Sequence, residues 1–226
     1  MRPTTDEIKI SILMSIYDTD PHHLIEAIES VKRQTYWNWE LCICNNCSTK
    51  SETRSALRKY QGRDVRIKIT RSPALLHIAS ATNLAAEFAT GDFIGFLDHD
   101  DTLAPDTIER VVEAATNYPK VDLFYTDEDK IAADNSYVEP HYKPEWSPEH
   151  LPSAMYLLHF LVIRKKLFLS LGCLCEKVSE TPDYDLALRA SQVALEIAHI
   201  PKVLYHRRKG SGETAAVAAA EPQALV

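Results

Sequence analysis

The sequence predicts an α/β fold in which helices flank a mixed, mostly parallel sheet. Three observations support this prediction. Apolar segments with the two-residue period of a strand alternate along the chain with segments that have the period of a helix. Clusters of polar residues separate these segments, as expected for loops. A chain of 226 residues is also long enough for one domain with a sizeable core. Strands and helices that alternate in this way form largely parallel sheets.

The first half of the chain carries the clearest alternation. In residues 8–16, Ile and Met alternate with Lys, Ser and Leu, which indicates the first strand. Asp20 and Pro21 then supply an N-cap and a first-turn proline for a helix that extends to about Arg33. The same patterns predict, in chain order, a strand at 40–44, a helix at 52–60, a strand at 65–69, a helix at 79–90 capped by Gly91, and a strand at 93–97.

The second half contains a proline-rich segment between predicted elements. Four prolines recur from Pro140 to Pro152, so this segment is extended rather than helical. It is either an interdomain linker or a substrate-facing loop, and Tyr142, Trp146 and His150 favour the loop. We expect one domain over 1–216 and a mobile tail at 217–226. The elements predicted here are a helix at 106–117, strands at 121–126 and 157–163, a helix at 164–171, a helix from residue 183, and a strand at 196–200.

The composition argues against several classes of protein. A net charge of −7 does not provide the basic face that a nucleic-acid-binding protein needs. The start of the chain is polar and the longest apolar run, residues 155–163, is too short to span a bilayer. We therefore expect a cytoplasmic protein that could still lie against the inner face of the membrane. Cys42 and Cys44 read as small buried hydrophobic residues with reduced thiols, and a zinc site built from the two cysteine clusters is the alternative.

The residues that follow the strand at 93–97 form the most informative motif in the sequence. In an extended chain, Asp98 and Asp100 point to the same side and His99 points away. Two carboxylates with no Lys or Arg among them suit a hard divalent cation that also holds phosphates. An acidic turn that caps the next helix is the alternative. Ligands of open α/β sheets bind at the carboxyl ends of the strands, where the polar residues 45–48 are also expected.

Taken in order, the segments of the chain resemble an inverting glycosyltransferase of family 2 with the GT-A fold. The resemblance covers about residues 10–215 and is closest to the branch that builds bacterial surface polysaccharides such as O-antigen and rhamnose-containing chains. It implies a nucleotide-binding part at about 8–101 and an acceptor-side part at about 102–216. The segments that carry it are 11–17, 27–36, 39–43, 81–83, 89–93, 97–101, 125–131, 143–148, 183–186 and 199–206.

On the donor side, the resemblance implies a metal-dependent reaction. Asp98 and Asp100 form a DxD element that holds Mg²⁺ or Mn²⁺ against the diphosphate of a nucleoside-diphosphate sugar of the UDP or dTDP type. His206 could reach the same metal. The further residues implied in binding the nucleoside or the diphosphate are Ser15, Tyr17, Asp18, Asn46, Asn83, His99 and Arg207.

On the acceptor side, Asp183 falls at the position of the family's general base. It would take the proton from the acceptor hydroxyl as the hydroxyl oxygen attacks the anomeric carbon with inversion. After Pro182, it also reads as a first-turn acid favoured by the helix dipole. Trp146 could bind the apolar face of a sugar ring or pack in the core. The acceptor is a saccharide or a lipid-linked molecule, and the residues implied on its side are Asp127, Glu128, Asp129, Trp146 and Asp185.

Three departures from the family pattern affect the site. Relatives usually have Asp-Asp-Gly-Ser at residues 45–48, a glycine pair at residues 76–77, and a glycine-containing stretch at 173–181 with Gln or Glu before the base. The sequence therefore supports two hypotheses. One is an active hexosyl- or deoxyhexosyl-transferase, favoured by Asp98, Asp100 and Asp183. The other is a degenerate GT-A domain that binds nucleotide or glycan or supports a larger assembly, favoured by Asn46 and the lost glycines.

Overall fold

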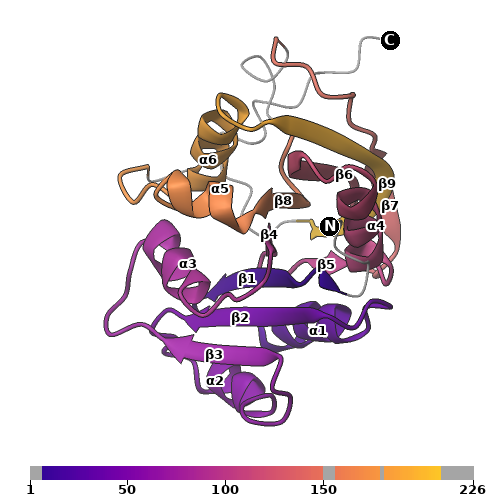
Figure 1. Cartoon of the computed structure of the whole chain (residues 1–226). Coiled ribbons are helices and arrows are strands. Elements are labelled where there is room, and N and C mark those ends of the chain that lie inside the picture. The colour runs from indigo at the N-terminus through magenta and orange to yellow at the C-terminus, as the bar shows by residue number, and fades with distance from the viewer. Residues whose placement is uncertain (1–6, 150–155, 179–180, 210–226) are drawn as a thin grey trace.

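The strands of the protein form one mixed sheet with helices on both faces (Figure 1). A computed structural model describes residues 7–149, 156–178 and 181–209. Within these residues the strand order is β3-β2-β1-β4-β8-β6-β9-β5, and β7 pairs with β6 away from this path. The strands are β1 (Ile10–Ile16), β2 (Trp39–Asn45), β3 (Ile67–Arg71), β4 (Phe93–Phe96), β5 (Thr102–Leu103), β6 (Val121–Ile131), β7 (Tyr137–His141), β8 (Leu161–Arg164) and β9 (Glu196–Arg208).

The helices divide between the two faces of the sheet. Buried side chains of α1, α2 and α4 share one apolar cluster with the strands, and those of α3, α5 and α6 share a second. Asp20 caps α1 as expected, because its Oδ1 accepts hydrogen bonds from the backbone of His22 and His23. The helices are α1 (Pro21–Lys32), α2 (Ser51–Arg58), α3 (Ile78–Ala86), α4 (Thr107–Asn117), α5 (Lys165–Ser170) and α6 (Pro182–Ser191).

The first half of the sheet confirms the prediction of parallel strands. β1 pairs in parallel with β2 and β4, and β2 with β3. Ser11, one of the polar residues that alternate with isoleucines in β1, is buried. Its hydroxyl donates to Glu40 at 2.6 Å, and Lys9 and Lys68 also contact that carboxylate. Burial opposes the charge of Glu40, but these contacts outweigh it and lower its pKa to about 2.

Gly91 serves a different purpose from the predicted helix cap. The helix at 79–90 ends earlier, at Ala86. A Cβ atom on Gly91 would lie 2.6 Å from Ser11 Oγ and 2.7 Å from the carbonyl oxygen of Lys9. The backbone N–H of Gly91 donates to Ser11 Oγ at 2.9 Å. The glycine is therefore needed for close approach to β1 and not to end a helix.

The second half of the sheet is more antiparallel than the alternation of elements suggested. β8 pairs antiparallel with β4 and β6, and β5 and β7 are also antiparallel to their neighbours. β6 and β9 are parallel and much longer than predicted, because register shifts near Asp127 let the pairing continue to Arg208. Val65 is 95% exposed, since β3 begins only at Ile67.

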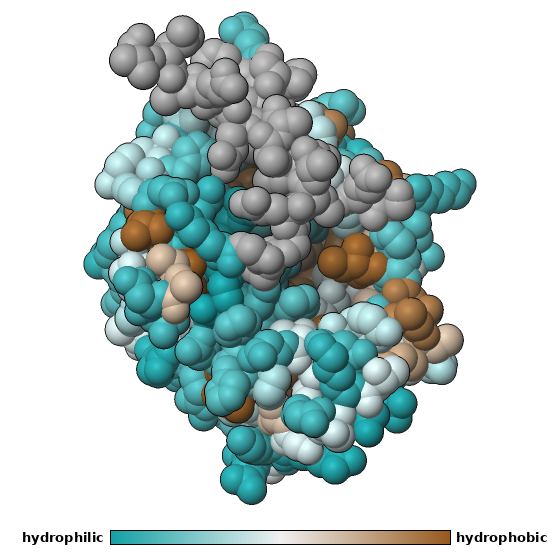
Figure 2. Space-filling view, turned by 180° about the vertical axis from the view of Figure 1, so that it is seen from behind, coloured by the Kyte–Doolittle hydropathy of each residue, from teal (hydrophilic) through white to brown (hydrophobic). Residues whose placement is uncertain are grey.

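No helix in the described part of the chain is long and apolar enough to cross a bilayer. Seen from behind, the surface is mostly hydrophilic, with apolar side chains in small scattered groups (Figure 2). The proposed mobile tail at 217–226 lies outside the described residues, as does His150.

Candidate active site

The acidic motif leaves the carboxyl end of β4 and is held there by β9. The backbone N–H of Asp98 donates to the Tyr205 hydroxyl at 3.1 Å, and that hydroxyl donates to Asp101 Oδ2 at 2.8 Å. The backbone N–H of Arg208 donates to the other oxygen of Asp101 at 2.7 Å. Burial and the charge of Asp98 raise the pKa of Asp101 to about 7. Asp101 thus fixes the loop and leaves the side chain of Asp98 55% exposed.

Asp183 and Asp98 line the same two small cavities. Asp183 lies in the first turn of α6, directly after the first-turn proline Pro182. Burial, followed by the negative charge of Asp98, raises the pKa of Asp183 to about 6. The lining of the first cavity is Leu13, Ser15, Ile78, Thr82, Phe96, Leu97, Asp98, Leu174, Pro182 and Asp183. The lining of the second is Phe96, Asp98, Leu158, His159, Leu161, Asp183 and Tyr205.

His159 is a site residue that the sequence did not identify. Its Nε2 lies 3.7 Å from Asp98 Oδ2, and its Nδ1 lies 3.3 Å from Glu128 Oε2. Burial disfavours the imidazolium, but the two carboxylates outweigh it and raise the pKa of His159 to about 9. Nearby protein atoms partly desolvate the exposed carboxylate of Asp98 and oppose its charge, but His159, His99 and Arg207 outweigh this effect and lower its pKa. The one sequence signal was a histidine that interrupts the apolar run 155–163.

Glu128, which the resemblance implies on the acceptor side, is surrounded by positively charged groups. Besides His159, its carboxylate lies 3.4 Å from Lys143 Nζ, 3.7 Å from Arg207 and 3.8 Å from His141. Burial opposes the charge of Glu128, but these cations outweigh it and hold its pKa well below its ordinary value. Lys143 is buried, which lowers its pKa to about 8 despite the attraction of Glu128. His159 therefore links Glu128, and Arg207 next to it, to Asp98 of the DxD element.

The neighbouring carboxylates of β6 each hold a histidine. Asp127 Oδ1 lies 2.8 Å from His199 Nε2 and accepts the backbone N–H of Lys143 at 2.8 Å. Asp129 Oδ1 lies 2.5 Å from Nδ1 of His206, whose ring stacks on Tyr137. Both carboxylates are buried. Their side chains thus organise the loops around the site.

Several residues implied on the donor side have structural partners. Ser15 lines the cavity that contains Asp98 and Asp183, and Tyr17 is 46% exposed. Asp18 accepts hydrogen bonds from the backbone of Thr49 and Lys50 at 2.7 and 2.8 Å. Asn83 exchanges two hydrogen bonds with the backbone N–H and carbonyl of Leu174. Of these residues, Ser15 lies in the same cavity as Asp98 and Asp183. The roles of all four residues in nucleotide binding stay predictions.

The side-chain amide of Asn46, which is implied in nucleobase binding, already forms hydrogen bonds within the protein. Its Nδ2 donates to the carbonyl oxygen of Leu76 at 2.8 Å, and its Oδ1 accepts the backbone N–H of Leu76 at 2.8 Å. The Ser72 hydroxyl also donates to Oδ1, at 3.1 Å. The amide of Asn46 therefore clasps the loop at 72–77. The next residue, Cys47, has a φ of 58°, a conformation that favours the glycine of the relatives.

We expect Asn46→Asp to release the loop at 72–77. An aspartate would place a carboxylate oxygen, in place of the donating Nδ2, against the carbonyl oxygen of Leu76. One hydrogen bond is lost and the two oxygens repel each other, at a cost of about 1–3 kcal/mol. Hydrogen exchange at the amide of Leu76 should accelerate. Asn45→Asp is the matched control, because Asn45 uses its Oδ1 as an acceptor from the N–H of Ser48 and an aspartate keeps that contact. Unchanged protection of Leu76 in Asn46→Asp would contradict the clasp.

The remaining implied residues on the acceptor side lie apart from the two small cavities. Asp185 pairs with Arg189 at 2.6 Å, and Arg189 also donates to the carbonyl oxygens of Leu171 and Cys173. Trp146 is partly buried and packs near Tyr156, with ring centroids 6.5 Å apart. Neither residue lines the cavities that Asp98 and Asp183 share. Their assignment to the acceptor side stays a prediction.

The cysteines behave as the composition indicated. Burial raises the pKa of Cys42 to about 12 and that of Cys44 to about 11, and both side chains are buried in the apolar cluster of α3. All five cysteines are free thiols. Buried thiols with raised pKa values, such as those of Cys42 and Cys44, are poor nucleophiles and poor metal ligands.

The donor set at the DxD element fits a divalent cation that also binds a phosphate. Asp98 and Asp100 offer hard carboxylate oxygens, and the nearest ion-pair partner of Asp100 is His99 Nδ1 at 3.5 Å. The Nδ1 of His99 is buried without a hydrogen-bond partner among the described residues. His206 engages Asp129 through Nδ1, the arrangement that orients the other ring nitrogen of a metal-binding histidine. No three His, Cys, Asp or Glu side chains gather into a closed metal site in the described ranges.

Comparisons with known proteins agree with this architecture. Residues 11–169 match the family described as Glycosyl transferase family 2. The chain is 39% identical over 217 residues to an uncharacterized protein of Sinorhizobium fredii, an alignment that covers 95% of this chain and 24% of that protein. It is 36% identical over 206 residues to the O-antigen biosynthesis protein RfbC of Myxococcus xanthus, covering 91% of this chain and 16% of that protein. The chain thus spans a quarter or less of the length of these relatives.

A solved structure shows the same fold. The crystal structure of S. aureus TarS 1-349 in complex with UDP-GlcNAc has a TM-score of 0.76 to this chain, covers 91% of it and 60% of the TarS chain, and is 18% identical. At that identity the likeness concerns the fold alone, the GT-A fold. The family match covers more than half of the chain. The chain therefore belongs to glycosyl transferase family 2 and has its GT-A fold.

Proposed function

We propose that the chain is a metal-dependent, inverting glycosyltransferase. It moves a hexosyl or deoxyhexosyl group from a UDP- or dTDP-sugar to a saccharide or lipid-linked acceptor in the synthesis of a surface polysaccharide. The observation that carries this proposal is the meeting of Asp98 and Asp183 at the same cavities. The names of the relatives, one an O-antigen biosynthesis protein and one a protein crystallised with UDP-GlcNAc, support the donor and acceptor classes.

The two carboxylates suit two different tasks. Asp98 keeps a lowered pKa and stays ionised, as a metal ligand must. Asp183 has a pKa of about 6, close enough to neutrality to accept a proton during the reaction and to return it to water. A divalent ion bound by Asp98 and Asp100, with His206 as a third possible ligand, would neutralise charge on the departing diphosphate.

The chain's own groups then account for the transfer. Asp183 takes the proton of the acceptor hydroxyl, whose oxygen forms a bond to the anomeric carbon. The bond between that carbon and the diphosphate oxygen breaks, and its electron pair leaves with the nucleoside diphosphate. Because the attacking and departing oxygens lie on opposite sides of the carbon, the configuration inverts. His159 and Arg207 hold positive charge beside Asp98, where the diphosphate is expected.

Thermal stability with nucleotides tests the donor side of the proposal. We expect UDP or dTDP together with Mn²⁺ to raise the Tm, and chelation of the metal to remove most of that rise. A ligand at a hundred times its Kd contributes about 2.7 kcal/mol of stability. GDP is the comparison nucleotide. The absence of any shift with all three would favour the second function, a degenerate domain, for which the occupied amide of Asn46 is the specific observation.

A further inference from the structure

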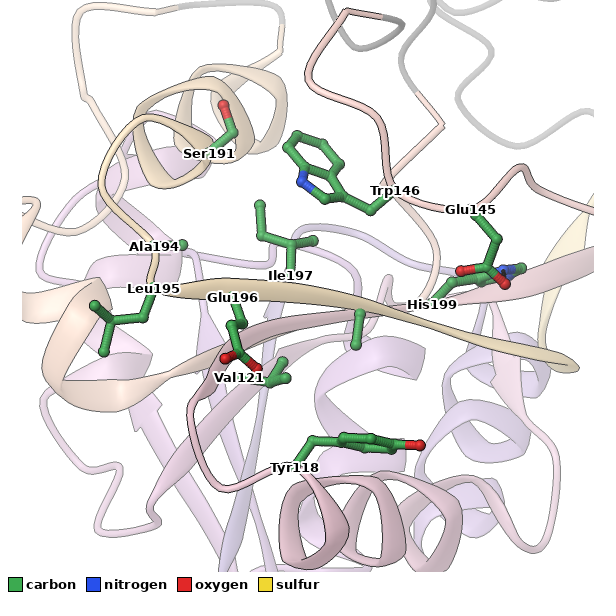
Figure 3. A pocket seen from close by; sticks show the side chains of 11 residues that line it. Tyr118, Val121, Glu145, Trp146, Ser191, Ala194, Leu195, Glu196, Ile197 and His199 are labelled. Carbon is green, nitrogen blue, oxygen red and sulfur yellow. Dashed lines mark ion pairs between the residues drawn. The ribbon is translucent and has the colours of Figure 1, made fainter.

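A second, larger pocket lies away from the catalytic cavities. It has a volume of about 610 Å³ and is formed where the end of α6, the first residues of β9 and the proline-rich segment meet (Figure 3). None of its lining residues lines the two cavities of Asp98 and Asp183. The lining is Tyr118, Val121, Glu145, Trp146, Ser191, Ala194, Leu195, Glu196, Ile197, Ala198 and His199.

The charges of this pocket exclude a nucleotide. The side chain of Glu145 is 83% exposed, and Glu196 is also exposed. The pocket's histidine, His199, is 3% exposed; Asp127 engages its Nε2 at 2.8 Å, and its Nδ1 lies 3.6 Å from Glu145 Oε1. Neither Lys nor Arg is among the residues that line it. A phosphate would meet two carboxylates and no free cation, so a bound molecule has to be uncharged or positively charged.

The remaining groups match a sugar. The indole of Trp146 projects over Ile197 toward Ser191 on one face of β9, and the ring of Tyr118, which is 59% exposed, lies on the other face of that strand (Figure 3). Aromatic faces of this kind pack against the C–H groups of a pyranose ring. The carboxylates of Glu145 and Glu196 accept hydrogen bonds from hydroxyl groups, and bonds to a charged acceptor are stronger than neutral ones. Polar atoms make up most of the exposed lining of this pocket, which favours a hydroxyl-rich ligand over an apolar one.

We propose that this pocket is a binding site for a neutral oligosaccharide, separate from the site of transfer. One sugar ring lies against Trp146 and donates to Glu145, and the glycan passes over the edge of β9 so that a further ring reaches Tyr118 and Glu196. Such a site would keep a glycan chain on the enzyme without occupying the catalytic cavities. Binding here requires neither a nucleotide nor catalytic turnover, so the proposal stands or falls independently of the proposed function.

Fluorine NMR of protein labelled with 5-fluorotryptophan tests this site. The chain has three tryptophans, and loss of one signal in Trp146→Phe assigns Trp146. Maltotetraose, chitotetraose and a rhamnose tetrasaccharide serve as neutral probes. We expect at least one of them to shift the Trp146 signal in a saturable manner and to leave the signals of Trp37 and Trp39 in place. No saturable shift with any probe, or equal shifts of all three signals, would overturn the proposal.

Two further measurements separate this pocket from the donor site. Glu145→Gln should weaken the binding of the effective probe about tenfold, because the neutral amide oxygen of glutamine accepts a weaker hydrogen bond than the carboxylate does. Glu149→Gln, an exposed residue of the same segment outside the lining, is the matched control and should leave the affinity unchanged. Saturating UDP with Mn²⁺ should not displace the probe. Displacement, or equal affinity in Glu145→Gln, would refute a separate carboxylate-assisted site.

Discussion

Asp183→Asn should lower the turnover of sugar transfer at least about a hundredfold, the lower end of what a positioned general base contributes. An amide has the shape of the carboxyl group but cannot accept the proton of the acceptor hydroxyl. Donor binding should change little, because Asp98 and Asp100 remain in place. Initial rates with a nucleotide-sugar panel and the Kd of UDP with Mn²⁺ measure the two quantities separately.

Asp134→Asn is a suitable control for the loss of one negative charge. Asp134 lies in the turn between β6 and β7, where it accepts hydrogen bonds from Ser136. This variant should keep the rate of the unmodified protein. Equal rates for Asp183→Asn and Asp134→Asn would remove Asp183 from the role of base.

The same substitution should stabilise the protein at high pH. The pKa of Asp183 is about 6 in the folded chain, above the ordinary value of 3.8, so folding disfavours its charged form. The protonated carboxyl contributes full stability below about pH 4, and this contribution is lost as the pH rises through about 6. The gap between the two pKa values corresponds to about 3 kcal/mol at most.

Thermal unfolding in metal-free buffer measures this effect. Asp183→Asn should unfold at a higher temperature than the parent protein at pH 8, and the difference should shrink at pH 5. In the parent protein, the rate of transfer should fall as the pH drops below about 6, because a protonated Asp183 cannot act as a base. A Tm difference that does not depend on pH would show that burial does not raise the pKa of this carboxyl.

Local rules predicted the elements on which Asp98 and Asp183 lie, whereas their meeting at one site was implied only by the resemblance to family 2. An apolar strand that ends in Asp98 must deliver carboxylates to the edge of the sheet, and Pro182 places Asp183 in a first helical turn. The parallel arrangement of β1 to β4 follows from the alternation of strands and helices. In these cases the local pattern is sufficient to predict the element, because each strand or helix packs against the element that is next to it in the chain.

Other parts of the site depend on contacts between distant segments. His159 meets Asp98 because β8 lies antiparallel beside β4, a pairing that no local pattern encodes. The support of Asp101 by Tyr205 depends on the continuation of β9 past Pro201, which the register shifts in the β6–β9 pairing make possible. Likewise, the hydrogen bonds between the Asn46 side chain and the Leu76 backbone join residues that are 30 positions apart in the sequence. Sequence periodicity carries no information on such pairs.

Asp100→Ala tests the DxD assignment and should remove the metal-dependent part of nucleotide binding. Its carboxylate has His99 as its ion-pair partner at 3.5 Å, whereas its backbone carbonyl, which accepts a hydrogen bond from Arg208, is kept in the variant. The fold should therefore persist while one of the two hard ligands is lost. We expect the rise in Tm with UDP and Mn²⁺ to fall to the level seen with UDP alone.

Asp101→Ala provides the informative comparison, because the two adjacent carboxylates have different tasks. Asp101 accepts from Tyr205 and from the backbone of Arg208, so its loss removes two hydrogen bonds at a cost of about 0.5–1.5 kcal/mol each. This variant should lower the Tm without ligand, and Asp100→Ala should not. If Asp100→Ala kept its full response to Mn²⁺, the cation would have to be bound elsewhere and the reading of this loop as a metal–diphosphate site would be wrong. If both variants only lowered the basal Tm, residues 98–101 would be a structural turn held by β9, because a ligand site requires at least one carboxylate whose loss affects binding more than folding.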